Sequence, residues 1–595
     1  MRNTTITMAG RRSSALAVFG LAFALMIPVS HSVTADVTPD VLKWYKSSAP
    51  TIQRSYSSGA KASSSTAILG NWSQPALLNT NGTSDSGSDG AVRIASDASG
   101  TLHAVWESDD AFGADHDIFY SQNAGGGWSA PALVNTNGNS DSGYDRWPEL
   151  TVDNSGTVYV VWFSDENLNG TAGTDTDIFY SRNSGSSWTS PALVNTNGNS
   201  DSDDDVVSKI VVDDSGTLHV VWWAEDNTND DDIFYSQNSG SGWTDPSPIG
   251  TPGTGQDVFP QMVIDNSGTL HVVWMHELYS QEVDELDIYY SKNSGSGWST
   301  PISIVAPGSE LNDAVARLTV DSSGTIHAIW CSGREIDGPE YTDYDIFCAS
   351  NSGSGWSTPV LVNVDGGSDT RDDIYPEMIV DGFGTMHAVW MAIDDIDNGP
   401  YYDYQLFYTM NKGAGWTTPR VMDSVYSWDV EWIPSPALAL DSSRTLHAAW
   451  PSRKDLNGTA GTDYDILHAT LAPITLDPIG MGMTAVECGE RLSFEVTAST
   501  FEDITPTLTA SNLPDDATFT DNRDGTGTFM WDTDESDLGT YPAVLFEANY
   551  GAFSDSEEGT IWVVTLVPAM NLLGLAFVLI TLVLGVCWCK RRDCK

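Results

Sequence analysis

Carboxylates interleaved with Asn and Gly recur along this 595-residue chain. The clearest segments are residues 164–177 (SDENLNGTAGTDTD), 195–205 (NTNGNSDSDDD) and 455–465 (DLNGTAGTDYD). Such oxygen-rich segments suit hard cations such as calcium, which takes six to eight oxygen ligands. The spacing is not that of an EF-hand, and plain solvated loops explain the same composition. The candidate calcium ligands are Asp175, Asp203, Asp204, Asp205 and Asp463.

Three tryptophans stand outside the repeated phrases of the chain and close to acidic segments: Trp147, Trp428 and Trp432. Indole rings can stack on the faces of sugars, so these residues are candidates for binding a glycan. Packing between neighbouring elements of the fold explains them equally well.

Histidine recurs at one position of a repeated phrase, at His103, His219, His271, His327, His387 and His447. A catalytic or metal site needs a few groups that converge on one point, whereas repeated copies point in different directions. We therefore expect each histidine to have a structural hydrogen bond to a neighbouring Asp or backbone group. No nucleophile elbow, HExxH, P-loop or dinucleotide fingerprint occurs in the sequence.

Acidic residues outnumber basic ones by 81 to 26, which gives a formal net charge of −55. A surface of this sign repels phosphate backbones and anionic membranes and attracts cations. Nucleic acid is therefore excluded as an expected partner. Hydrophobic residues still make up 40 % of the chain, so we expect a folded and turn-rich protein.

Three phrases each occur seven times. One resembles SGTLHVVW, one resembles DIFYS, and one is a Trp followed by a pattern such as SxPxLVN. Together they predict units of four short strands, rich in Val, Ile, Tyr, Phe and Trp and separated by Gly, Ser, Asn and Asp turns. Four-stranded units at this period predict an all-β, seven-bladed β-propeller over residues 70–472.

The phase of the repeats predicts how the ring closes. The repeats begin with an unpaired fourth strand at Trp72 and end with a third strand over residues 465–471. We expect these two pieces to complete one blade. The connections between strands 2 and 3, and between strand 4 and the next strand 1, are long and acidic, so the face that carries them is the candidate binding face.

The spacing of Ser236, Asn238, Gly240 and Trp243 resembles the Asp box of sialidase-type propellers, S-x-D-x-G-x-x-W, with Asn at the Asp position. The resemblance covers residues 70–471. It implies a turn between the third and fourth strands of each blade, in which the Asn side chain accepts bonds from loop amides and the Trp packs between blades.

The same resemblance implies a second possible activity, that of an exo-sialidase-like glycoside hydrolase. Sialidases hold the substrate carboxylate with three arginines and use a Tyr nucleophile, a Glu and an Asp acid/base. Arg93, Arg146 and Arg317 lie near first strands, where such arginines could sit. No FRIP motif is present, the nearest string being VRIA at residues 92–95, and an acidic face opposes an anionic sugar.

Residues 473–566 change character. ERLSFEVTAS (490–499) and DGTGTFMWDTDESDLGTY (524–541) resemble the bacterial putative-Ig, cadherin-like family, which implies an Ig-like β-sandwich. Members of that family often bind calcium through a DPDGD-like loop, for which this chain has TFEDI at residues 500–504. We expect this domain to act as a stalk. Residues 36–69 are predicted to be a Ser-rich linker.

Both ends of the chain carry targeting features. Residues 1–35 read as a signal peptide, with Arg11 and Arg12 before an apolar run. Residues 572–589 form an uncharged apolar stretch followed by KRR, which predicts a membrane-spanning helix within residues 567–595. VPAMNLLG, the apolar span and KRR together resemble a PEP-CTERM-type sorting signal, which implies that the tail is removed during sorting. We expect export to the cell envelope or surface.

Cys331 and Cys348 fall at the end of one predicted strand and within the next. A cross-strand disulfide between them is one prediction, and a pair of buried thiols is the other.

Taken together, these features predict an exported, envelope-anchored binding or adhesion protein. Its acidic propeller face would bind an extracellular glycan or protein, with calcium as a candidate cofactor.

Overall fold

The computed structural model describes residues 72–565 apart from short gaps. These gaps are residues 83–86, 110–114, 139–142, 169, 171, 174, 199–202, 226–230, 251–254, 280–283, 306–311, 334–342, 365–370, 395–402, 427–434, 455, 457–462, 473, 477–483, 501–504 and 551–552. The chain divides into two compact units, Met1–Leu471 and Ala472–Lys595. The described residues contain strands, turns and one short 3-10 element, η3 (Glu535–Asp537), so the all-β prediction is confirmed for them.

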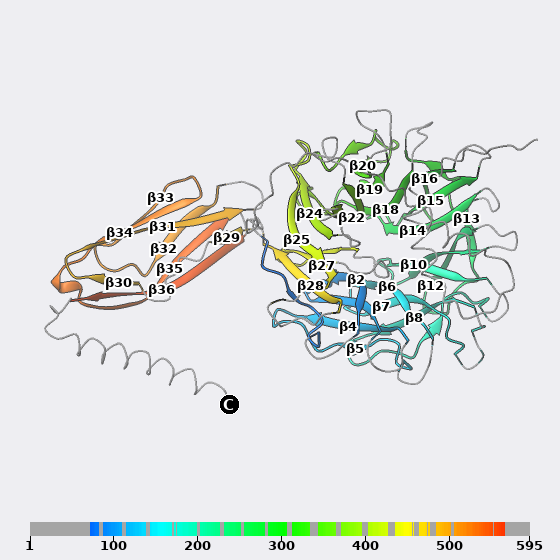
Figure 1. Ribbon diagram of the computed structural model, residues 1–595, viewed down its shortest axis with the longest axis horizontal. Coiled ribbons are helices and arrows are strands. Elements are labelled where there is room, and N and C mark those ends of the chain that lie inside the picture. The colour runs from blue at the N-terminus through cyan, green and yellow to red at the C-terminus, as the bar shows by residue number, and fades with distance from the viewer. Residues whose placement is uncertain are drawn as a thin grey trace, which may run out of the picture. The chain divides into compact units, whose positions relative to one another are not determined.

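The first unit contains seven four-stranded antiparallel sheets in its described residues (Figure 1). The first three are β2 (Asp89–Ser96), β3 (Leu102–Ser108), β4 (Asp117–Asn123), β5 (Ala132–Leu133); β6 (Arg146–Val152), β7 (Val158–Ser164), β8 (Asp177–Asn183), β9 (Ala192–Leu193); and β10 (Asp205–Val212), β11 (Leu218–Glu225), β12 (Asp231–Asn238), β13 (Ser247–Ile249).

The next three sheets are β14 (Gln256–Ile264), β15 (Leu270–Tyr279), β16 (Asp284–Asn293), β17 (Ile302–Ser303); β18 (Asp313–Val320), β19 (Ile326–Ser332), β20 (Asp345–Asn351), β21 (Val360–Leu361); and β22 (Asp372–Val380), β23 (Met386–Asp394), β24 (Asp403–Asn411), β25 (Arg420–Tyr426). The seventh joins β1 (Ala76–Leu77) to β26 (Ala437–Leu440), β27 (Leu446–Ser452) and β28 (Asp465–Leu471).

The first strands of the seven sheets follow one another around a ring. Each contacts the first strand of the next sheet, in the order β2, β6, β10, β14, β18, β22, β26 and back to β2. The ring closes through the seventh sheet, where Ala76 pairs with His468 and Trp72 forms a bridge with Leu471. The arrangement is therefore propeller-like, and the predicted pairing of the chain near Trp72 with the segment near Ile466 is observed.

Each sheet is held by a buried second strand and its tryptophan. β3, β7, β19 and β27 are buried along their whole length, and their tryptophans are at most 1 % exposed. The indole N–H of Trp106 donates to Asp89 (3.0 Å), a residue at the start of the same sheet's first strand. Because an unpaired buried N–H is costly, this bond fixes the position of the first strand.

Six of the seven fourth strands have only two or three residues, whereas β25 has seven. In the third sheet the repeated Trp phrase begins at Trp243, whereas β13 covers only the last three residues before Gly250. Each fourth strand follows directly after a proline, for example Pro131 before β5 and Pro191 before β9. Proline lacks an N–H and interrupts the ladder, so the Trp before it is joined to the third strand only by an isolated bridge, as Trp243 is to Asn238.

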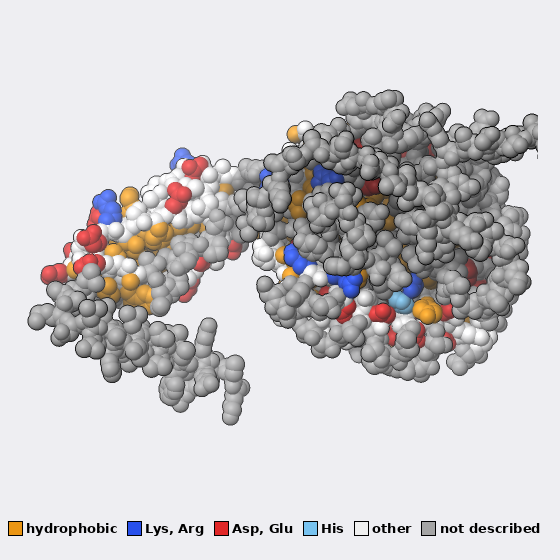
Figure 2. Space-filling model, in the orientation of Figure 1, with side chains coloured by type: hydrophobic (Ala, Val, Ile, Leu, Met, Phe, Trp, Pro, Cys, Tyr) orange, Lys and Arg blue, Asp and Glu red, His pale blue; other side chains and the backbone are white. Residues whose placement is uncertain are grey.

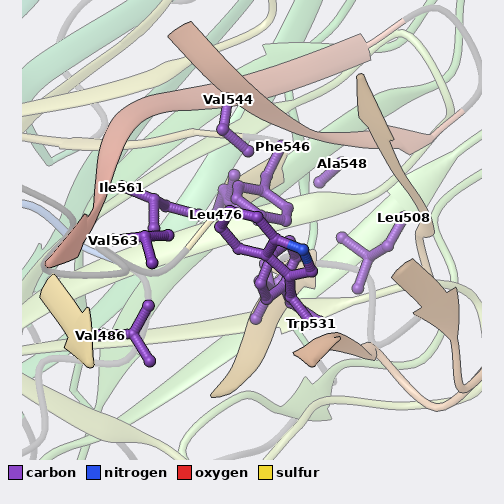
Figure 3. Packing of buried hydrophobic residues seen from close by; sticks show 12 residues of the cluster. Leu476, Val486, Leu508, Trp531, Val544, Phe546, Ala548, Ile561 and Val563 are labelled. Carbon is purple, nitrogen blue, oxygen red and sulfur yellow. The ribbon is translucent and has the colours of Figure 1, made fainter. Parts of the chain in front are cut away.

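The second unit contains two four-stranded sheets. One has the order β29 (Ile474–Leu476), β31 (Arg491–Thr500), β34 (Thr526–Asp532), β33 (Thr518–Asp521), and the other β30 (Thr484–Glu487), β36 (Phe553–Val564), β35 (Gly539–Tyr550), β32 (Thr507–Ser511). Both supply one core, in which Trp531 and Phe529 of the first sheet pack with Phe546 and Ile561 of the second (Figure 3). The unit is thus a β-sandwich.

No helix within the described residues is long and apolar enough to cross a membrane. The predicted span at residues 572–589, the signal peptide and the linker at 36–69 lie outside the described residues and stay predictions.

Candidate functional site

The first strands carry a bulge near their starts. In six sheets the pairing with the second strand shifts by one residue, as between Gly90 and Arg93 in β2. One residue of each bulge has a positive φ without being glycine: Ala91, Trp147, Val207, Phe259, Val315 and Tyr375, with φ between 48° and 55°. Non-glycine residues in this region are strained and concentrate at functional sites. The bulges lie at the face that carries the connections between strands 2 and 3.

Aromatic residues occupy three of these bulges. Trp147 and Phe259 come from β6 and β14, which are separated in the ring by β10, yet their ring centroids are 6.3 Å apart. Trp223, from the end of β11, lies 6.5 Å from Phe259. Contact between strands that are not neighbours shows that Trp147 and Phe259 turn toward the axis of the ring. Both are half-buried and reachable from solvent.

Polar groups border these rings. The backbone N–H of Trp147 donates to the carboxylate of Glu107 (2.7 Å), and a guanidinium nitrogen of Arg146 lies 2.9 Å from His116 Nε2. Burial raises the pKa of Glu107, although the positive charge of Arg146 opposes the shift. Burial, followed by the charge of Arg146, lowers the pKa of His116 to about 3, so this imidazole is neutral. We call Glu107, Arg146, Trp147, Trp223 and Phe259 the axial cluster.

A second set of side chains, the axial ring, lies two residues beyond the bulges. Its members hold the same register against the second strands of their sheets: Arg93, Glu149, Lys209, Gln261, Arg317 and Glu377. Arg93 Nε lies 2.5 Å from Glu149 Oε1, and Lys209 Nζ lies 2.6 Å from Glu149 Oε2. Figure 2 shows Lys and Arg side chains close to Asp and Glu on the visible face of this unit.

Charge pairing dominates the electrostatics of the axial ring. Burial would raise the pKa of Glu149, but Arg93 and Lys209 outweigh it and lower that pKa to about 2. Arg317 Nε lies 3.3 Å from Glu377, and burial lowers the pKa of this arginine. Each cation of the ring therefore already has a carboxylate beside it.

The three arginines suggested by the sialidase resemblance have different partners. Arg93 and Arg317 belong to the axial ring, where Glu149 and Glu377 pair with them, whereas Arg146 contacts His116 and Tyr144. Of the tryptophans suggested for glycan stacking, Trp147 lies in the axial cluster. Trp428 and Trp432 lie outside the described residues.

Several acidic residues are structural. Asn135 Nδ2 donates to Asp117 (2.6 Å) and to Asp145 (2.7 Å), which directly precedes the next sheet, so one amide joins two sheets. Asp205, a calcium candidate, has the corresponding role: it accepts from Asn195 (2.6 Å) and from the indole of Trp222. Asp204 accepts from the backbone N–H of Thr176 (2.9 Å).

The other calcium candidates, Asp175, Asp203 and Asp463, are half-buried at the same face. Within the described residues no three His, Cys, Asp or Glu side chains gather as a metal site. Calcium therefore stays a prediction.

Asp115 and Asp117, which the sequence analysis did not single out, lie side by side before and at the start of β4. They are 5 % and 0 % exposed, and one oxygen of each, Oδ1 of Asp115 and Oδ2 of Asp117, has no hydrogen-bond partner. Burial first, and the charge of Asp115 next, raise the pKa of Asp117 to about 6.

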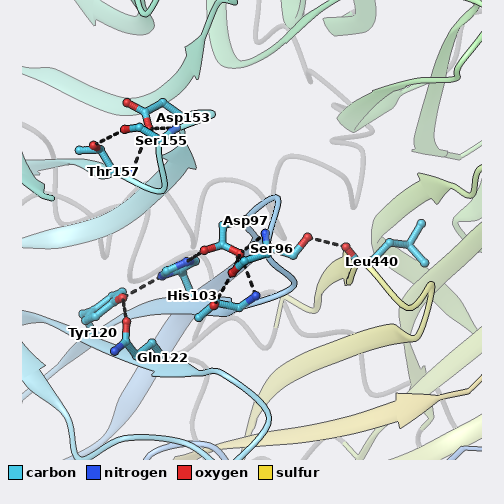
Figure 4. A network of polar contacts seen from close by, with 11 residues as sticks. Ser96, Asp97, His103, Tyr120, Gln122, Asp153, Ser155, Thr157 and Leu440 are labelled. Carbon is cyan, nitrogen blue, oxygen red and sulfur yellow. Dashed lines mark hydrogen bonds and ion pairs between the residues drawn. The ribbon is translucent and has the colours of Figure 1, made fainter. Parts of the chain in front are cut away.

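The histidine prediction is confirmed. His103 Nδ1 shares a hydrogen bond with Tyr120 Oη (2.8 Å), and its Nε2 lies 3.5 Å from Asp97, which also accepts from Ser99 and Thr101 in the turn after β2 (Figure 4). His271 repeats the pattern with Tyr290 and Asp265. Burial lowers the pKa of both histidines, which makes them neutral structural groups.

The predicted disulfide is wrong, and the alternative of two buried thiols is correct. Cys331 pairs with Ile346, and Cys348 pairs with Ile329, so the two cysteines are offset by two positions on one face of the sheet. Such diagonal neighbours lie about 7–8 Å apart, beyond the usual reach of a disulfide. The thiol of Cys331 donates instead to the carbonyl of Ala314.

No protein-family model matches the chain, and no curated protein matches it. Solved structures do. A protein of unknown function from Dyadobacter fermentans is 11 % identical, over 57 % of this chain and 99 % of its own, with a TM-score of 0.38. An ulvan lyase bound to a saccharide is 12 % identical, over 66 % and 95 %, with a TM-score of 0.43.

A leech intramolecular trans-sialidase is 11 % identical, over 67 % of this chain and 69 % of its own, with a TM-score of 0.33. These structures are similar to this chain in outline, and at such scores the likeness says nothing about the ligand of this protein.

Proposed function

We propose that this chain is an exported, envelope-anchored binding protein, in which a seven-bladed propeller presents the axial cluster to an extracellular glycan. An Ig-like second unit then serves as a stalk between the propeller and a C-terminal membrane segment. The observation that carries the proposal is the meeting of the half-buried rings of Trp147 and Phe259 at the axis.

The composition of the axial cluster suits a sugar. Sugars offer apolar C–H faces and hydroxyl groups, which aromatic rings and charged hydrogen-bonding groups recognise together. Trp147 and Phe259 supply the rings, and Arg146 with Glu107 supplies a donor and an acceptor beside them. The bulge recurs in six sheets, so it belongs to the fold, and Trp147 and Phe259 differ from the copies at Ala91, Val207 and Val315 in carrying a ring.

Hydrolysis of the sialidase type is the alternative, and the axial ring argues against it. A clamp for a substrate carboxylate needs guanidinium groups that are open to the substrate, whereas Glu149 pairs with Arg93 and Glu377 pairs with Arg317. Binding without turnover therefore agrees better with the described residues.

The test is a glycan array probed with the purified full-length protein, followed by titration of the strongest glycan into the Trp147→Ala variant. Ala91 holds the equivalent bulge at φ 48°, so alanine suits this backbone. We expect affinity to fall about five- to thirtyfold, since a stacked ring contributes on the order of 1–2 kcal/mol.

Phe383→Ala is the matched control, because Phe383 is 55 % exposed in the turn between β22 and β23, at the opposite face. It should leave affinity unchanged. Equal affinities of wild type and Trp147→Ala would contradict the proposal, and release of free sugar from the array glycans would favour hydrolysis.

A further inference from the structure

Asp115 and Asp117 each have a buried carboxylate oxygen without a hydrogen-bond partner, and a positive charge beside them would stabilise the pair. Both residues are buried, they are two positions apart where the chain enters β4, and each has a carboxylate oxygen without a hydrogen bond. Two adjacent buried carboxylates are unfavourable unless a cation or a proton compensates them. The amide of Asn135 bonds to the other oxygen of Asp117 and supplies no charge.

The backbone around Asp117 is shaped to admit its carboxylate. A Cβ at Gly138 would lie 2.0 Å from Asp117 Oδ1, so only glycine lets the carboxylate lie against this turn. The same approach recurs in the next sheet, where a Cβ at Gly198 would lie 2.0 Å from Asp177 Oδ1. There the Gly198 carbonyl and an oxygen of Asp175 both lie beside Gly173, so carboxylate and carbonyl oxygens come together.

Two motifs occur together in the same sheets. Asn-x-Asn-Gly or Asn-x-Asp-Gly follows the fourth strand at residues 79–82, 135–138, 195–198 and 363–366. In each of these four sheets, Asp-x-Asp precedes the third strand, at residues 463–465, 115–117, 175–177 and 343–345. Of the three sheets without the Asn motif, two also lack the Asp pair, with Glu-Leu-Asp at 285–287 and Asp-Tyr-Gln at 403–405.

We propose that the Asp115–Asp117 pair binds a calcium-like hard divalent cation, and that the equivalent pairs in three other sheets bind one each. Carboxylate oxygens supply charge, and carbonyl groups of the turn with water complete six to eight oxygen ligands. Each proposed site uses only two carboxylates, so it agrees with the absence of a group of three acidic side chains within the described residues. The sites lie in individual sheets, so the proposal is independent of glycan binding at the axis.

The experiment is a calorimetric titration of CaCl₂ into EDTA-treated, full-length protein at about 0.15 M KCl, which screens non-specific attraction to the acidic surface. We expect saturable binding of up to four ions and a rise in Tm on adding calcium. Asp115→Asn keeps the shape of the side chain and removes one charge, so it should lose one of these ions.

Asp214→Asn is the matched control, since this exposed residue lies in a turn of the opposite face and its change removes the same charge. It should bind as many ions as wild type. Asp463→Asn repeats the test in the seventh sheet, so the result does not depend on the folding of one variant. The proposal is overturned if wild type shows no saturable calcium binding, or if both site variants retain every ion. A rise in Tm of calcium-free Asp115→Asn with no loss of ions would instead indicate that a proton neutralises the pair.

Discussion

Single buried carboxylates explain part of the acidity of this chain. Asp89, Asp145, Asp205 and Asp373 are each at most 4 % exposed, and each accepts from the tryptophan indole of its own sheet and from an Asn of the preceding one. Charge-assisted bonds of this kind are about twice as strong as neutral ones. The number of acidic residues therefore overstates the charge of the surface, because some of these carboxylates are buried and hold neighbouring sheets together.

The axial ring predicts acid sensitivity. The folded-state pKa of Glu149, about 2, lies below its ordinary value of 4.5, so this group stabilises the fold above pH 4.5 and loses that contribution as the pH falls toward 2. Glu149→Gln should lower the free energy of unfolding by about 3 kcal/mol at pH 7. Urea unfolding at pH 7 and at pH 3 measures the difference, which should shrink at the lower pH.

Asp214→Asn again provides the control and should change stability by less than about 0.5 kcal/mol. If Glu149→Gln lowered the free energy of unfolding by the same amount at pH 7 and at pH 3, Glu149 would not be held as a carboxylate.

The axial ring could have been found from the sequence. Its residues stand 13 positions before the tryptophan of each second strand, and aligning the seven copies gives Arg93, Glu149, Lys209, Gln261, Arg317, Glu377 and Ala437. At this position of the first strand, positive and negative residues alternate from Arg93 to Lys209 and again from Arg317 to Glu377. Such alternation indicates ion pairs between neighbouring sheets. The contact of Trp147 with Phe259 had no such signal, because it depends on bulges that bend strands from separate sheets toward the axis.

At the scale of single elements, the turn between the third and fourth strands was predictable in detail. Asn238 Oδ1 accepts from the backbone N–H groups of Gly240 (2.8 Å) and Gly242 (3.2 Å), and both glycines have positive φ. The tryptophan that follows packs edge-on against a tyrosine of the preceding sheet, as Trp243 does against Tyr180 at 5.5 Å.

Asn238→Ala removes the acceptor for both amides and should destabilise the first unit by about 1–2 kcal/mol. Asn238→Asp keeps the acceptor and should have nearly wild-type stability. Thermal unfolding of the two variants beside wild type provides the measurement, and an alanine variant as stable as the aspartate variant would mean that the side chain does not hold the turn.

The register of β19 and β20 gives a prediction for the cysteines. Cys331 and Cys348 are offset and buried, and burial raises the pKa of the Cys348 thiol to about 12. We expect a reducing agent to leave Tm unchanged, and a thiol reagent to label both residues only after unfolding. Peptide mapping of the unreduced protein tests this prediction. A disulfide-linked peptide containing both cysteines would contradict it.

At the scale of the whole molecule, the number and order of the sheets followed from counting repeats, because each phrase recurs once per sheet. The length of the fourth strands did not follow from the repeats. The proline before each fourth strand limits its pairing with the third strand, and counting repeats does not reveal this effect. The closing sheet was predictable because a repeat that begins out of phase leaves one strand to be paired at the far end of the unit.

Two truncations test the closure. A chain lacking residues 1–70 keeps every described residue and should unfold at the same Tm as the full chain. A chain lacking residues 1–78 loses β1, which leaves the edge of β28 unpaired, and its Tm should fall by several degrees. Equal Tm values for the two truncations, measured by calorimetry, would show that β1 does not stabilise the ring.

The closing sheet also has a consequence for folding during synthesis, because its strands come from both ends of the first unit. Asn79 and Asp465, which are bonded to each other, are 386 residues apart. At about 5–20 residues per second, a ribosome needs roughly 20–80 s to make the partner of the first strand. For that interval β1 has no partner strand, so we expect the seventh sheet to form last.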